Sequence, residues 1–319
     1  MTVIMLFLDG VGIGAMDPRV NPVWAASMPA LRSLFDGALP SLRHRALRSS
    51  RASAIPLDAN LGVPGLPQSG TGQTALFTGV NGAKVAGRHF GPHPYSTLKP
   101  IIRESNIFRR LLDAKKNPCF ANAFPQRFFD YMDQKRARLT VTTLSCVSAG
   151  IPLLRAPDLA AGRGVSADIT GEGWKGLGYP DMRAITPHEA GRRLAALCND
   201  HDFVLFEYWK TDHAGHAMDR GEAIAVLEAF DGLLGGLLDA ADLSSTLLLI
   251  TSDHGNIEDI TVKTHTRHPV PLIAAGRRHE QFISRLQNGR AAPPDLTCVT
   301  PAVLDAVRDE EPVEVPLIP

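Results

Sequence analysis

The sequence lacks the features that would set it apart from ordinary globular proteins. Its 319 residues include only 4 cysteines, which are widely separated and form no CxxC pair, so the spacing argues against a zinc knuckle and a disulfide framework. Lysine plus arginine equals aspartate plus glutamate, at 33 each, so no global basic field favours nucleic acid or an anionic membrane. We therefore expect neither partner, and any recognition of a phosphate must be local.

Long apolar runs are also missing. The apolar stretch VIMLFL near the N-terminus has no basic segment before it and ends in Asp9, so a signal peptide is not expected. A membrane span would need roughly 18 apolar residues in a row, which no window of the chain supplies. A buried strand fits the stretch better. We expect a cytoplasmic protein whose cysteines are reduced, buried thiols.

Apolar runs and helical patterns alternate through most of the chain. Strands are predicted over residues 3–8, 119–124, 203–208, 245–251 and 270–274, and helices over 28–35, 73–77, 98–116, 187–198, 220–240 and 300–307. Continuous apolar strands that alternate with helices are typical of α/β proteins. The pattern therefore predicts a doubly wound, mostly parallel sheet with helices on both faces.

The middle of the chain has a less regular pattern. Residues 125–185 contain glycine- and proline-rich stretches and few long periodic segments. We predict an α/β core made of residues 1–124 and 186–319, with residues 125–185 as a small insertion or cap.

The chemistry is concentrated in short segments at the edges of predicted strands and helices. They are LFLDG with Asp9, PQSGTG with Ser69, TDHAGH with Asp212 and His216, SDHGN with Asp253 and His254, and KTHTRHPVP with His265. In open α/β sheets, ligands bind beyond the carboxyl ends of the strands. The three aspartates follow predicted strands, so we expect them to converge on the edge where a site should lie.

These side chains suit two divalent cations beside a serine nucleophile. Asp212 and His216 are four residues apart, so one helical turn or a tight loop brings them to one face, with His265 as a third ligand. Two nitrogens and a carboxylate favour Zn²⁺ or Mn²⁺, with Mg²⁺ as an alternative.

A second cation would bind a separate set of side chains, namely Asp9, Asp253, His254 and the Ser69 hydroxyl. A cation on the hydroxyl lowers its pKa and so activates it without a histidine base. Two cations about 3.5–4 Å apart can stabilise the attacking and leaving oxygens of an in-line displacement. The set therefore indicates phosphoryl transfer.

Two of these positions have close rivals. Thr71 lies two residues after Ser69, and spacing favours Ser69. His268 competes with His265, and the spacing to the following Val-Pro favours His265, with His268 nearer the substrate. Five further side chains are available to hold a phosphate or a polar leaving group, although surface solvation is the default for each: Arg88, His89, Lys99, Arg127 and Lys210.

Taken together, the segments resemble the alkaline phosphatase superfamily, and within it the branch of cofactor-independent phosphoglycerate mutase and phosphopentomutase. The resemblance rests on LDGVG, on a serine three residues before Gly72, and on TDHAGH, SDHGN and HTRHPVP. It covers residues 1–90 and about 190–319. It implies one metal on Asp212, His216 and His265, and another on Asp9, Ser69, Asp253 and His254.

Two departures from that branch bear on the reaction. Gln73 stands where the two mutases commonly have histidine, and the middle segment is much too short for the large insertion domain of the phosphoglycerate mutase. A mutase must hold its dephosphorylated intermediate while it reorients, so a small cap favours hydrolysis. We predict a phosphatase that acts on a small phosphorylated metabolite through a phosphoserine at Ser69. A phosphomutase is the alternative, and a catalytically silent metal-binding protein is a more distant one.

Overall fold

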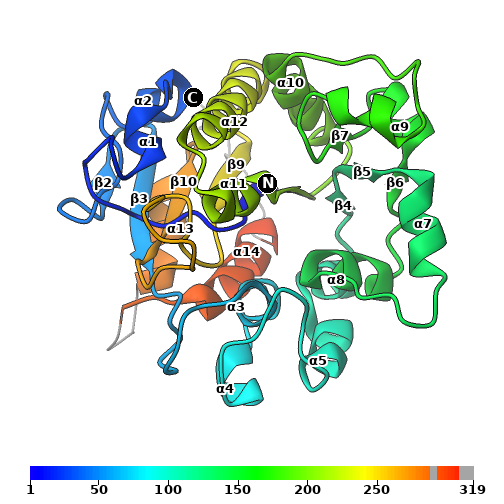
Figure 1. Cartoon of the computed structure of the whole chain (residues 1–319), viewed down its shortest axis with the longest axis horizontal. Coiled ribbons are helices and arrows are strands. Elements are labelled where there is room, and N and C mark those ends of the chain that lie inside the picture. The colour runs from blue at the N-terminus through cyan, green and yellow to red at the C-terminus, as the bar shows by residue number, and fades with distance from the viewer. Residues whose placement is uncertain (288–292, 309–319) are drawn as a thin grey trace, which may run out of the picture.

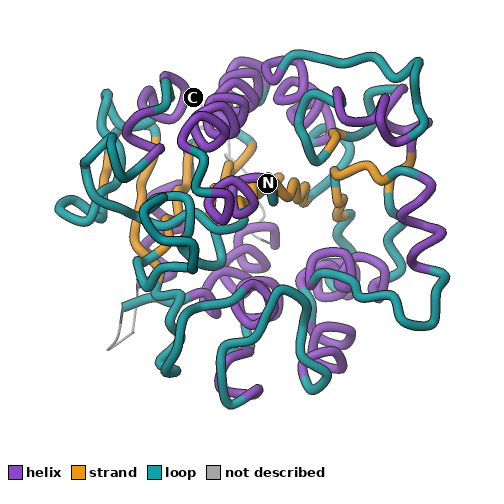
Figure 2. Tube along the Cα trace, viewed as in Figure 1, coloured by secondary structure: helices purple, strands orange, loops and turns teal. Residues whose placement is uncertain are grey.

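The computed structural model describes residues 1–287 and 293–308, and a seven-stranded sheet runs through it in the order β2-β3-β10-β9-β1-β8-β4 (Figures 1 and 2). The strands are β1 (Thr2–Leu8), β2 (Leu47–Arg48), β3 (Ala52–Leu57), β4 (Pro118–Phe120), β8 (Phe203–Tyr208), β9 (Thr246–Thr251) and β10 (Val270–Ala275). Strands β4, β8, β1 and β9 are parallel, whereas β10 runs antiparallel to β9 and β3. The predicted α/β fold with a largely parallel sheet is confirmed.

The central strands are buried on both faces, which explains their continuous apolar sequences. Alternate side chains of a strand point to opposite faces of the sheet. Accordingly, Val3 and Met5 of β1 belong to one hydrophobic cluster, and Ile4 and Leu6 belong to the other. All residues of β8 and β9 are buried. Two apolar layers therefore hold the sheet between the helices.

Helices cover both faces of the sheet. One cluster includes side chains from α3 (Ser69–Thr78), α4 (Gly82–Ala86), α5 (Leu98–Ser105), α6 (Ile107–Asp113), α8 (Val141–Ala149), α13 (His279–Gln287) and α14 (Val299–Arg308). The other includes side chains from α2 (Pro29–Ser33), α10 (Pro187–Leu197), α11 (Lys210–Ala217) and α12 (Arg220–Ala240), and α1 (Pro22–Ala25) packs against it. Figure 1 shows α10 and α12 on the upper side and α3, α8 and α14 on the lower side. None of the helices in the described part of the chain is both long and apolar enough to span a bilayer.

Helices α10 and α12 pack closely because glycines face the partner backbone. A Cβ atom at Gly191 would lie 1.9 Å from the Leu233 carbonyl oxygen, and one at Gly236 would lie 1.9 Å from that of His188. Both helices also begin at side-chain caps. Thr186 accepts a hydrogen bond from the Glu189 N–H, and Asp219 accepts one from the N–H three residues later. This pair of helices backs the strands that lead to the candidate site.

Several local details differ from the sequence-based expectations, including the start of α3, which begins at Ser69 and not at the predicted Gln73. The helix predicted over 98–116 is two helices, because Asn106 is extended and its side chain caps α6. The strand predicted over 119–124 divides between β4 and β5 (Asn122–Phe124), which lie in different sheets. Strand β3 was not predicted, since ASAIPL is short and carries Pro56, which lies opposite Pro271 of β10.

A second, three-stranded sheet lies beside the main one, in the order β6-β5-β7. It consists of β5 with β6 (Leu154–Arg155) and β7 (Val165–Ser166), accompanied by α7 (Gln126–Met132), α9 (Ala156–Ala160) and the 3-10 helix η1 (Glu172–Leu177). Helix α8 comes from the same stretch of sequence, yet Val141, Leu144 and Cys146 belong to the main core. We propose that residues 125–185 form a cap that uses α8 as its attachment to the core.

Candidate metal centre

The predicted ligands lie beyond the carboxyl ends of three adjacent parallel strands. Asp9 follows β1, Asp253 lies two residues after β9, and Asp212 lies in α11, which begins two residues after β8. Because β1 pairs in parallel with both β8 and β9, these three ends meet at one edge of the sheet. The structure therefore brings together carboxylates that are up to 244 residues apart in the sequence (253 − 9).

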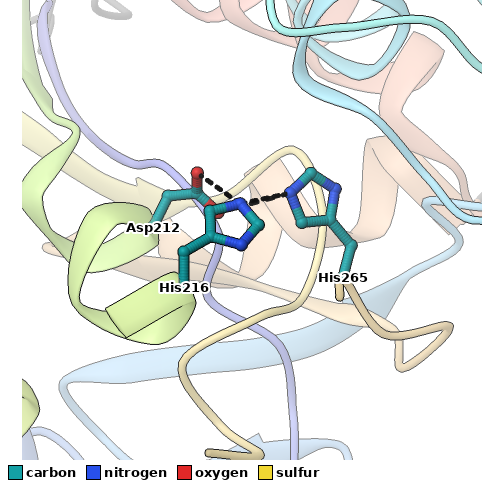
Figure 3. Close-up of side chains that lie close together, drawn as sticks. All are labelled: Asp212, His216 and His265. Atoms are coloured by element: carbon teal, nitrogen blue, oxygen red, sulfur yellow. Dashed lines mark hydrogen bonds and ion pairs between the residues drawn. The ribbon is translucent and has the colours of Figure 1, made fainter. Parts of the chain in front are cut away.

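Asp212, His216 and His265 form the first group of side chains (Figure 3). Asp212 and His216 lie one turn apart on α11, and His216 Nε2 is 3.3 Å from Asp212 Oδ2. His265 Nε2 is 3.5 Å from Asp212 Oδ1 and 3.1 Å from His216 Nε2. Three potential ligand atoms thus face one another.

The backbone fixes the orientation of the two rings in this group. His216 Nδ1 donates to the Lys263 carbonyl at 2.8 Å, and His265 Nδ1 donates to the Pro67 carbonyl at 2.7 Å. In neutral rings, both Nε2 atoms then present lone pairs to the same point, the arrangement of metal-ligating histidines. Burial and the neighbouring His254 lower the pKa of His265 to about 4, which keeps the ring in its neutral, ligating form.

The second group contains Ser69, the first residue of α3, together with Asp9, Asp253 and His254. His254 Nε2 lies 3.0 Å from Ser69 Oγ, 3.3 Å from Asp9 Oδ1 and 3.6 Å from Asp253 Oδ2. Ligand atoms of Asp9, Asp212 and His254 also fall within 4.8 Å of one another. Asp212 therefore lies between the two groups, although the sequence assigned it to only one.

Crowding among the carboxylates shows that a cation fits here. Burial, followed by the charges of Asp253, Asp212 and Glu207, raises the pKa of Asp9 well above its ordinary value. Asp9 Oδ1 is buried and forms no hydrogen bond with the described residues, although His254 Nε2 lies 3.3 Å away. A divalent cation would pair with this orphaned oxygen and offset the repulsion between the carboxylates.

Parts of the chain are similar to known proteins. The family model described as "Metalloenzyme superfamily" matches residues 171–305. The 2,3-bisphosphoglycerate-independent phosphoglycerate mutase of Pyrococcus abyssi is 36% identical over 85 residues, which are 27% of this chain and 20% of that protein. The enzyme of the same name from Clostridioides difficile is 32% identical over 120 residues, 35% of this chain and 22% of that protein. The matches thus span about a fifth of those relatives.

Solved structures with similar folds match almost the whole chain. A Pyrococcus horikoshii protein covers 97% of this chain and 98% of its own, with a TM-score of 0.56 and 15% identity. The alkaline phosphatase of the Antarctic bacterium TAB5 covers the same shares, with a TM-score of 0.53 and 13% identity. Residues 171–305 are thus similar to the metalloenzyme superfamily, and the fold of the chain is similar to that of an alkaline phosphatase. Five of the seven predicted ligands lie inside the range that matches the metalloenzyme family model, and Asp9 and Ser69 lie before it.

Gln73 connects two buried carboxylates of the predicted ligand set, Asp9 and Asp253. Its Nε2 donates to Asp9 Oδ2 at 3.3 Å and to Asp253 Oδ2 at 3.1 Å. The sequence marks Gln73 as a departure from the mutases but does not reveal this bridge. An amide is neutral and donates two hydrogens, so it can hold two carboxylates side by side. Gln73 therefore orients both oxygen ligands toward the space between them.

Glu258 is a buried carboxylate that sequence analysis missed. Its Oε2 accepts hydrogen bonds from the Gly12 N–H and the Asn256 N–H, both at 2.8 Å. Its Oε1 accepts from His268 Nδ1 at 3.0 Å and from the Thr266 hydroxyl. Burial alone would raise the pKa of Glu258, but the hydrogen bonds from these partners outweigh burial and lower it. One carboxylate thus links three loops of the site.

The rivals of two predicted residues have other partners in the structure. His268 pairs with Glu258, which raises the pKa of His268, whereas His265 faces Asp212. The Thr71 hydroxyl donates to the Gln68 carbonyl at 3.0 Å, whereas the hydroxyl of Ser69 faces His254.

Proposed function

We propose that the chain is a metal-dependent phosphohydrolase that attacks a phosphate ester through Ser69. The observation that carries the proposal is the position of the Ser69 hydroxyl, 3.0 Å from His254 Nε2 at the junction of two groups of potential metal ligands. Two divalent cations, Mn²⁺ or Zn²⁺, would lower the pKa of the hydroxyl and neutralise charge on the phosphoryl oxygens when bound.

The two groups would divide the ligands as follows: one set is Asp212, His216 and His265, and the other is Asp9, Ser69, Asp253 and His254. Asp212 would contribute to both, because its carboxylate also faces Asp9 and His254. The fixed ring orientations and the Gln73 bridge would hold these ligands in place without reorganisation.

The reaction of the chain's own residues has two steps. Ser69 Oγ forms a bond to phosphorus as the bond between phosphorus and the ester oxygen breaks, and the alcohol leaves with a proton. Water then attacks phosphorus in the phosphoserine, which restores the hydroxyl and releases inorganic phosphate. Ser69 opens α3, so the positive end of the helix dipole lies beside the developing charge.

A phosphomutase is the second candidate, because the curated relatives are named as phosphoglycerate mutases. It would use the same serine and differ in the fate of the phosphoryl group. A hydrolase transfers this group to water, whereas a mutase returns it to the dephosphorylated intermediate. Release of inorganic phosphate therefore separates the two.

The test uses metal-stripped protein, an aryl phosphate and added Mn²⁺, Zn²⁺ or Mg²⁺. We expect metal-dependent phosphate release that falls on the order of 10³-fold or more in Ser69→Ala. Thr71→Ala, which removes a hydroxyl from the same helix turn, is the matched control and should keep most of the activity. Mass spectrometry of acid-quenched protein should locate the phosphoryl group on Ser69. Stoichiometric metal binding without phosphate release would refute the hydrolase.

A further inference from the structure

A cavity of about 590 Å³ opens beside Asp9, between the main sheet and the second sheet. Asp9 is the one member of the proposed ligand set that lines it, so the cavity adjoins the candidate metal centre. Its size falls within the roughly 300–1,000 Å³ of ligand pockets in proteins. The cavity therefore has the place and the size to hold the part of a substrate that lies beyond its phosphate.

Aromatic side chains from separate elements form the walls of this cavity. Phe124 is the last residue of β5, Phe128 and Tyr131 belong to α7, and Trp209 lies just before α11. The rings of Phe124 and Phe128 stack with their centroids 4.5 Å apart. Such walls offer large apolar faces with few rotatable bonds, which suits an apolar ring better than a small polar acid.

Trp209 stands out because it is 44% exposed although its side chain is large and apolar. It lies three residues before Asp212, so the same short segment carries a cavity wall and a ligand of both proposed metal groups. Because Trp209 also lines the cavity, a ligand bound there would cover part of its exposed surface.

The lining of the cavity also carries charged side chains of both signs. Arg127 and Lys210 are the two cations of the lining, against the acids Asp9, Asp168 and Glu207. The carboxylate of Asp168 is held by the N–H groups of Gly171 and Gly173, at 2.8 Å each. A cation in the metal centre would offset the charge of Asp9, and burial raises the pKa of Glu207 to about 7. The aromatic walls, rather than these charges, therefore carry the preference for a ring.

We propose that this cavity binds the alcohol part of the substrate and that the substrates are phosphate monoesters of alcohols bearing an aromatic ring. The proposal rests on the proposed phosphohydrolase function and extends it to a substrate class. Trp209 and Phe128 are the specificity-determining residues, because their faces border the space that the ring would fill.

The test compares 2-phenylethyl phosphate with ethyl phosphate. Both lose a primary alkoxide, so a difference in kcat/KM reports the ring and not the reactivity of the ester. We expect the phenyl ester to be favoured by about tenfold or more, as for an apolar group that fills a complementary pocket. Trp209→Ala, and Phe128→Ala as a second variant, should bring the ratio of the two kcat/KM values toward one. Trp24→Ala, at a tryptophan in α1 outside the cavity, should keep the ratio.

A binding measurement without turnover separates failure of the cavity from failure of the chemistry. Saturation-transfer NMR should detect the ring of 2-phenylethanol on the wild-type protein and lose the signal in Trp209→Ala. Turnover of both esters at equal kcat/KM, or a preference that survives both variants, would overturn the cavity proposal and leave the phosphohydrolase standing. No turnover with a Trp209-dependent ring signal would support the cavity and refute the chemistry, and no turnover without that signal would overturn both.

Discussion

Removal of the Glu258 carboxylate should destabilise the whole site, because this side chain is completely buried and holds several loops together. Glu258→Ala leaves the N–H groups of Gly12 and Asn256 without their acceptor. A buried donor that loses its partner costs about 1–3 kcal/mol, so the two together should lower the free energy of unfolding by about 2–6 kcal/mol. The gap left at Glu258 adds to this loss.

Glu258→Gln should be much milder, because its amide oxygen can still accept from both N–H groups. What it removes is the negative charge opposite His268, so the expected loss is about 1–2 kcal/mol. The two substitutions therefore separate loop attachment from charge. Glu228→Ala is the matched control, since this exposed glutamate accepts from one backbone N–H, that of Ser27. That loss should stay below about 1 kcal/mol.

Urea denaturation of the metal-free protein measures these differences, and equilibrium dialysis with Mn²⁺ measures their effect on the site. Asn256, which Glu258 anchors, donates to Asp212 Oδ1 at 2.6 Å. Glu258→Ala should therefore weaken cation binding by about 10–100-fold, as is usual when a side chain that orients a ligand is lost. If the Ala and Gln variants lose equal stability, or if Ala matches the exposed control, the loop-anchoring argument is wrong.

Three further outcomes follow from the geometry. Gln73→Leu should destabilise the metal-free protein more than the metal-loaded one, because a cation can replace the amide between the two carboxylates. Equal decreases in the melting temperatures of the two forms would contradict this. Burial raises the pKa of Glu207 to about 7, above its ordinary 4.5, so the stability that protonated Glu207 supports below about pH 4.5 is lost as pH rises through 7. In the metal-free protein, Glu207→Gln should therefore raise the free energy of unfolding relative to wild type, and this difference should be about 2–3 kcal/mol larger at pH 8 than at pH 5. Urea denaturation at the two pH values measures it, and a difference that does not change with pH would rule this out. Asp212→Asn should weaken the binding of both cations in equilibrium dialysis, whereas His216→Ala should weaken the binding of only one. Equal stoichiometry in the two variants would argue against an Asp212 that is shared by both sites.

The elements that the sequence predicts best are those whose signals are local. Helix α12 begins and ends at the predicted residues, because Asp219 caps it and apolar residues recur along it. Strand β8 also matches, since a continuous apolar run between polar segments leaves few alternatives. The ligand motifs are predictable for the same reason, because their signals are local. Asp212 and His216 face one point because one helical turn separates them, and that turn is readable in TDHAGH.

What the sequence could not predict depends on contacts between distant residues. Glu258 lies 246 residues from Gly12, and nothing near either position signals the hydrogen bond between them. Strand β3 carries a proline and gains its place only by pairing with β10, which belongs to the other end of the chain. The division of residues 119–124 between two sheets likewise follows from partners that no local pattern names.

The same distinction explains why the motifs indicate the reaction but not the substrate. The ligand set of the metal centre is concentrated in short motifs, whereas the cavity walls come from β5, α7 and the residue before α11, which meet only after folding. Substitutions at Phe128 could therefore change which alcohol fits while leaving every proposed ligand in place. Trp209 is different, because it lies next to α11 and its backbone leads directly to Asp212. A change at Trp209 that moved α11 would alter metal affinity as well as selectivity, so measuring both in the same variant shows how far substrate choice and metal binding are coupled.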